Sequence, residues 1–275
     1  PAKPMNREKF RLFPLFFFLS FSYFCTGEQK KIPKIEIKAN IWGGASTRDI
    51  QKILHSAVRQ IWPYAHQKKL SSIKIERSRT GPIVLYRRGE KGEYLVRLDS
   101  EKTYWNQYAF QFAHEFGHII CGYKKGDRSN LWFEETLCET ASLFTLRGMT
   151  KEWKTKPLFP ERTEYGKEFA KYAQNRLEKF PWPQNQTLAE WYSREKNSLS
   201  NKPTQRDRNV RLASQLLPYF EANPGLWGSC AFINVNKSNK KRSFVTYLMD
   251  WKKNCLELNH KTFVGQLIIE FGLNE

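Results

Sequence analysis

The residues whose types could do chemistry together lie between positions 114 and 118. His114 and His118 are four residues apart, with Glu115 between them, in the pattern H-E-x-x-H. On a helix this spacing places both imidazoles on one face, about one turn apart. They can bind one Zn²⁺ together, while the Glu115 carboxylate can act on a water at the metal without binding the metal itself. The pattern therefore predicts zinc-assisted hydrolysis with Glu115 as the general base.

Two imidazoles are too few, because catalytic zinc usually has three protein ligands and one open position. The next acidic cluster along the chain is in the segment 131–139. Glu135 and Glu139 are four apart and share a helical face, whereas Glu134 points about 100° away. One of the same-face pair would bind zinc, and the other would accept a hydrogen bond from the second nitrogen of a ligand histidine. Glu134 and Asp127 are further alternatives for the third ligand.

The H-E-x-x-H pattern followed by W-x-x-E on the next helix resembles the gluzincin metallopeptidases over about residues 93–142. Their aminopeptidase branch carries W-x-N-E-G-x-A, and their thermolysin branch carries N-E-x-x-x-D. The resemblance implies that Glu135 is the third zinc ligand and that Glu139 supports a ligand histidine. Glu134 replaces the family's asparagine and Thr136 its glycine. The exopeptidase signature G-x-M-E-N is missing, so an endopeptidase is implied.

The resemblance also implies how a peptide would be held. In gluzincins the strand just before the H-E-x-x-H helix is an edge strand that binds peptide, and residues 93–98 occupy that place here. A tyrosine or histidine of the C-terminal lobe stabilises the tetrahedral intermediate. The sequence does not select among the candidates for that role, which are Tyr165, Tyr172, Tyr192, Tyr219, Tyr247 and His260.

The elements that must position these residues follow from the hydrophobic periodicity. Apolar alternation predicts strands near residues 35–41, 73–75, 83–86 and 94–98, with a helix starting at Ser46 after the first. Helical spacing predicts a helix over about 101–121 and another over 131–147 that ends at Gly148. Further helices are expected at 165–179, 188–197, 205–217, 243–257 and 261–271. We therefore predict an α+β fold, with a zincin-like lobe over residues 28–150 and a mostly helical lobe over 151–275.

Residues 1–27 have the order of a secretory signal: a basic start, an apolar run over 13–24 and a small-residue exit at Cys25-Thr26-Gly27. Cleavage after Gly27, lipid attachment at Cys25 and a retained membrane anchor are all compatible with this order. We expect an exported protein, whether periplasmic, secreted or lipid-anchored. The other cysteines permit two disulfides or four buried thiols; they are Cys121, Cys138, Cys230 and Cys255.

The net charge is +19, and residues 1–27, with four basic and one acidic side chain, account for +3 of it. The remaining +16 favours acidic substrates, anionic polymers of the cell envelope or a membrane surface as partners. The basic residues are scattered, with only a short cluster at residues 237–242, and no nucleic-acid motif accompanies them, so nucleic acid is not an expected partner. The leading hypothesis is an exported zinc peptidase acting on peptide or protein substrates. The alternative is a non-hydrolytic, basic envelope-binding protein on the same scaffold.

Overall fold

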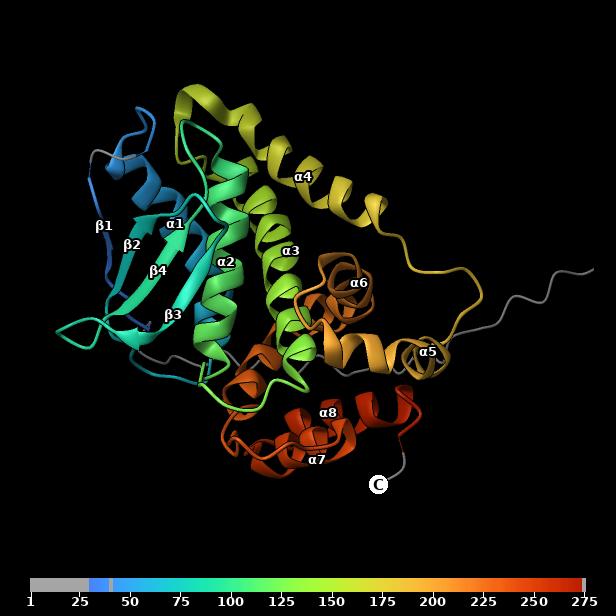
Figure 1. Cartoon of the computed structure of the whole chain (residues 1–275). Helices are drawn as coiled ribbons and strands as arrows, with labels where there is room; N and C mark the ends of the chain where they lie inside the picture. Colours follow the sequence, from blue (N-terminus) through green and yellow to red (C-terminus); the bar gives the residue numbers. More distant parts are fainter. Residues whose placement is uncertain (1–29, 40–41, 274–275) are drawn as a thin grey trace, which may run out of the picture.

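The computed structural model describes residues 30–39 and 42–273. The predicted signal segment, residues 1–27, lies outside them. The predicted α+β class is confirmed: a small four-stranded mixed sheet lies at one side of the molecule, and the C-terminal half is mostly helical (Figure 1). None of the helices in the described residues combines the length and apolar character needed to cross a bilayer.

The sheet has the strand order β1-β2-β4-β3. Three strands run parallel, and β3 runs antiparallel to β4. The strands are β1 (Ile35–Ile37), β2 (Ile73–Arg77), β3 (Ile83–Arg88) and β4 (Tyr94–Leu98). The prediction that residues 93–98 form an edge strand is wrong. Because β4 pairs with β2 on one side and with β3 on the other, it is an inner strand, and β1 and β3 are the two edge strands.

Two helices pack together and lie beside the sheet (Figure 1). They are α1 (Thr47–Ile61) and α2 (Trp105–Ile120). As predicted, the Ser46 side chain caps α1 by accepting a hydrogen bond from the Asp49 N–H at 3.4 Å. Tyr108, Phe112 and Phe116 on α2 are buried at helical spacing, so α2 is fixed against its neighbours along its length.

Helix α3 (Leu131–Thr155) is longer than the sequence predicts, because it continues through Gly148 for two more turns. Leu146, Met149 and Trp153 are all buried, so the apolar face of the helix continues past the glycine. Gly148 is a packing residue and not a helix end. A Cβ there would meet the Oε1 end of the Gln60 side chain, on α1.

The rest of the chain is helical. Its elements are the 3-10 segment η2 (Pro160–Tyr165), α4 (Gly166–Lys179), α5 (Leu188–Asn201), α6 (Arg206–Ala222), the 3-10 segment η3 (Pro224–Phe232), α7 (Phe244–Asn254) and α8 (Leu258–Glu270). Thr187 and Glu190 form a capping box at the start of α5. One hydrophobic cluster includes residues from β1 through to the end of α8, so the sheet and the C-terminal helices share a core.

Candidate metal centre

The site is built on two antiparallel helices that approach each other closely. His118, near the end of α2, faces the start of α3, and His114 faces α3 one turn further along. Gly117 makes this approach possible, because a Cβ on it would lie 3.0 Å from the Cα of Cys138 and 3.1 Å from its Sγ. The absence of a side chain at residue 117 therefore sets the distance between the two helices.

We expect Gly117→Ala to lower the free energy of unfolding by about 1–3 kcal/mol, because the added methyl overpacks the helix contact. Gly265→Ala on α8 is the matched control. Its Cβ would meet only the end of the Lys252 side chain, at 3.5 Å, and a helical Gly→Ala change usually stabilises by about 0.5–1 kcal/mol. Urea unfolding of both variants measures the difference. Equal stability of the two would contradict the close-approach role of Gly117.

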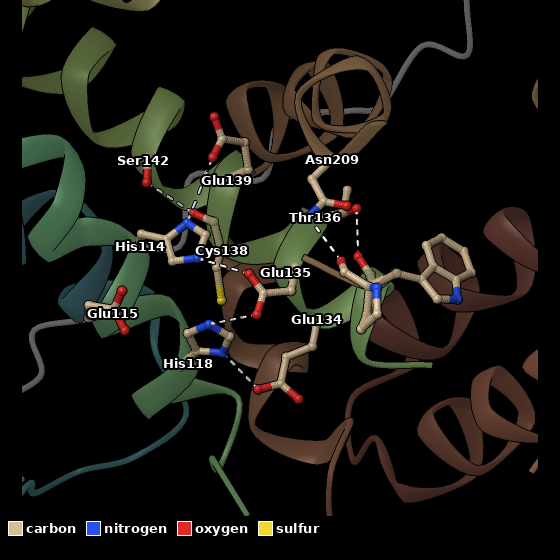
Figure 2. A network of polar contacts seen from close by, with 12 residues as sticks. His114, Glu115, His118, Glu134, Glu135, Thr136, Cys138, Glu139, Ser142 and Asn209 are labelled. Atoms are coloured by element: carbon tan, nitrogen blue, oxygen red, sulfur yellow. Dashed lines mark hydrogen bonds and ion pairs between the residues drawn. The ribbon is translucent and has the colours of Figure 1, made fainter. Parts of the chain in front are cut away.

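Glu135 lies where the resemblance requires the third ligand. Its carboxylate faces both ligand histidines: Oε2 is 3.2 Å from His114 Nε2, and Oε1 is 3.6 Å from His118 Nε2 (Figure 2). Ligand atoms about 2.0–2.2 Å from one zinc in a tetrahedral arrangement are about 3.4 Å from each other. The two separations from Glu135 are close to that spacing.

The other nitrogen of each histidine faces a different carboxylate. His114 Nδ1 is 3.7 Å from Glu139 Oε2, an ion-pair distance longer than a good hydrogen bond. Arg176 on α4 donates to Glu139 Oε1 at 2.7 and 2.9 Å and so holds this carboxylate in place. His118 Nδ1 is 2.8 Å from Glu134 Oε1, a normal hydrogen bond. Carboxylates in these positions orient a ligand histidine and select its tautomer.

Glu134 makes a contact that the sequence did not predict. A rotation of about 100° does turn it away from Glu135, but it turns it towards the C-terminal end of α2, where His118 lies. Its second oxygen accepts from Asn234 Nδ2 at 2.9 Å and from Lys237 Nζ at 3.1 Å. Both groups come from the segment after η3, so the C-terminal half of the chain fixes a carboxylate that contacts His118.

Glu115 lies beside the two histidines and is almost fully buried (Figure 2). Its Oε2 accepts a hydrogen bond of 2.6 Å from the backbone N–H of Val84, which belongs to the edge strand β3. Burial raises the pKa of Glu115, and the two neighbouring histidines partly oppose the rise. A buried carboxyl group with a raised pKa is suited to accept and return a proton.

The electrostatics of the cluster favour a divalent cation. Its four carboxylates belong to Glu115, Glu134, Glu135 and Glu139. Two cations pair with them: Arg176 with Glu139 and Lys237 with Glu134. About two negative charges are therefore left over when the imidazoles are neutral. Burial alone would lower the pKa of His114, but the hydrogen bond to Glu135 and the nearby Glu139 carboxylate outweigh burial and raise it to about 10. In the same way, Glu134 is buried, yet His118 and Lys237 hold its pKa down at about 2.

Cys138 is a second possible third donor. The donor atoms of His114, His118 and Cys138 lie within 4.8 Å of one another. Glu135, the third ligand that the resemblance implies, contacts the Nε2 atoms of both histidines, while Cys138 Sγ lies against Gly117. Burial raises the pKa of the Cys138 thiol well above its usual value. All four cysteines of the described residues are buried free thiols.

The remaining candidates lie elsewhere, with one exception. Asp127 accepts from the backbone N–H groups of Ser129 and Arg242 in the loop after α2. Tyr247 alone among the proposed C-terminal side chains is near the site, with its hydroxyl 3.5 Å from Asn234 Oδ1. The contacts given for the other five are with residues outside the cluster of histidines and carboxylates; they are Tyr165, Tyr172, Tyr192, Tyr219 and His260.

Tyr123 is an aromatic neighbour of the site that the sequence did not indicate. Its ring centroid is 5.0 Å from that of His118, and its other face stacks on Tyr86 of β3 at 4.1 Å. No spacing rule connects a loop tyrosine with a strand tyrosine 37 positions earlier, so only the folded chain could reveal the pair.

Comparisons of this chain with models of protein families, with curated proteins and with solved structures find no match.

Proposed function

We propose that this protein is a zinc-dependent peptidase of the gluzincin type, with His114, His118 and Glu135 as metal ligands. The observation that supports this most strongly is the Glu135 carboxylate, which faces the Nε2 atoms of both histidines at 3.2 and 3.6 Å. The α+β arrangement, with the site on a helix that packs beside a small mixed sheet, is compatible with a zincin-like scaffold.

Zinc bound there would polarise a scissile carbonyl and make water nucleophilic near neutral pH. Glu115 holds and moves the proton: it takes one from the attacking water and returns it to the leaving amine. The Val84 N–H donates to Oε2 of the Glu115 carboxylate and so fixes the orientation of the carboxylate. The other oxygen, Oε1, is left to accept the proton. Glu134 and Glu139 keep the histidine rings oriented with Nε2 inward.

The edge strand β3 supplies a place for the peptide. Val84 of β3 anchors the general base, so an extended chain that pairs with the exposed edge of β3 passes close to Glu115. A site open along a strand edge accepts the middle of a chain, which favours an endopeptidase. Export remains a prediction from residues 1–27.

The test of this proposal is removal and return of the metal. We expect the purified protein to contain about one zinc per chain and to hydrolyse members of a mixed peptide library. A chelator should abolish hydrolysis, and added Zn²⁺ should restore it. Zinc at a thousand times its Kd should also stabilise the fold by about 4 kcal/mol, which thermal unfolding would show independently of turnover. Hydrolysis that persists in protein shown to be metal-free would refute the mechanism.

The alternative hypothesis, a non-hydrolytic envelope-binding protein, makes a different prediction. Such a protein has no chemical need for a buried glutamate anchored beside the two histidines. Salt-sensitive binding to an anionic envelope polymer, with no turnover of any peptide by the zinc-loaded protein, would favour it.

A further inference from the structure

Two loops that are far apart in the sequence lie side by side next to the metal site. They are residues 122–130, which join α2 to α3, and residues 233–243, which join η3 to α7. The Asp127 N–H donates to the Ser238 carbonyl at 2.7 Å, and Asn130 Nδ2 donates to the Arg242 carbonyl at 2.9 Å. Gly126 permits the contact, because a Cβ there would lie 2.7 Å from the Ser238 oxygen. We call these segments the paired loops.

The paired loops carry an excess of exposed positive charge. Lys237 is buried against Glu134, and Arg242 pairs with Asp250, so these two cations are neutralised. Five others are exposed, and none of them forms an ion pair with a carboxylate of the residues that the structure describes. We call these five the basic rim; they are Lys124, Lys125, Arg128, Lys240 and Lys241.

The basic rim is connected directly to the catalytic groups. The loop 122–130 follows His118 and leads into α3, and its Tyr123 packs on the His118 ring. Tyr123 also stacks on Tyr86, so the rim adjoins the exposed edge of β3. A chain lying along β3 past Tyr86 therefore reaches the rim within a few residues.

We propose that the basic rim binds acidic side chains of a polypeptide substrate and thereby selects acidic segments for cleavage. The inference rests on the proposed peptidase function and names the substrate class of the same site. Five cations that lack carboxylate partners attract a chain of opposite charge, in binding and in diffusional encounter. A membrane surface fits less well. Interfacial binding needs a broad apolar face, and Val235 is the one large exposed hydrophobic residue of the paired loops.

The test measures binding without turnover. Zinc-loaded Glu115→Gln protein is mixed with a fluorescent peptide rich in glutamate and with the same peptide carrying glutamine at those positions. Fluorescence anisotropy gives both Kd values at low and at physiological ionic strength. We expect tighter binding of the acidic peptide, with an advantage that shrinks as salt is added. The variant K124Q/K125Q/K240Q/K241Q should lose about tenfold or more of its affinity for the acidic peptide and little for the neutral one.

The matched control removes as many charges elsewhere. K151Q/K154Q/K156Q/K171Q changes exposed lysines near the far end of α3 and on α4. Lys151 is 20 residues beyond Leu131, or about 30 Å along the helix. We expect less than a twofold change in affinity in this variant. An equal loss in both variants would assign the effect to total charge and overturn the inference.

Other outcomes separate this inference from the proposed function. Hydrolysis by wild-type protein that shows no preference for acidic peptides, and no change in the rim variant, overturns the inference and leaves the peptidase standing. Tighter rim-dependent binding to an anionic polymer or to anionic vesicles than to the acidic peptide also overturns it. Rim-dependent binding of the acidic peptide supports the inference, and the hydrolysis of wild-type protein then tests the peptidase separately.

Discussion

Glu115→Gln is expected to lower the rate of peptide hydrolysis by at least 10²–10⁴-fold while leaving zinc content unchanged. The reason is that Glu115 is not a ligand in the proposed centre: it is anchored to the Val84 N–H and lies beside the histidines. The glutamine oxygen can still accept the Val84 hydrogen bond, so the local structure is retained. What the substitution removes is the capacity to take a proton from water.

The measurement compares metal content, thermal unfolding and turnover of one peptide in wild type and variant. Glu90→Gln is the matched control, because Glu90 is an exposed glutamate in the β3–β4 turn and the same change of charge occurs there. The control should keep full activity. A Glu115→Gln variant that binds zinc and still hydrolyses peptide at the wild-type rate would exclude Glu115 as the general base.

The sequence predicted the structure best where a chemical motif lies inside a helix with a clear apolar periodicity. The helix carrying H-E-x-x-H was predicted over residues 101–121 and is found over Trp105–Ile120, because its apolar face has the spacing of a buried helix. The same local information limited the predicted third ligand to Glu135 or Glu139, since a helix following a short loop returns beside the first, and the resemblance implied Glu135. Inferences within one helix pair need only helical geometry, and they place Glu135 against both histidines as the resemblance implied.

The errors concern contacts between distant segments. The order of β3 and β4 in the sheet depends on which strand pairs with β2, and the alternation of apolar residues is the same in either case. The role of Glu134 depends on Asn234 and Lys237, about 100 residues later. The end of α3 was misplaced because a glycine favours a helix end locally. At Gly148, burial of Met149 and Trp153 on the next turns overrides that local preference.

The third ligand can be decided by measuring zinc affinity in two variants of neighbouring residues on α3. Glu135→Ala is expected to lower the affinity by more than the 10–100-fold that is typical of losing a partner outside the ligand set. Cys138→Ser is expected to change it by less than tenfold, because the thiol packs against Gly117 and is not counted among the proposed ligands. Competition with a chromogenic chelator gives both affinities.

Two further variants measure how much zinc affinity is lost when a carboxylate outside the proposed ligand set is changed. Glu139→Gln and Glu134→Gln remove a negative charge from the carboxylates that face the Nδ1 atoms of His114 and His118, and each should cost about 10–100-fold in zinc affinity. Glu134→Gln should have the larger effect, since its bond to His118 is 2.8 Å whereas the Glu139 contact is 3.7 Å. Urea unfolding of each metal-free variant separates lost affinity from lost stability. If Cys138→Ser loses zinc and Glu135→Ala keeps it, the centre has two histidines and a cysteine, and the assignment of Glu135 is wrong.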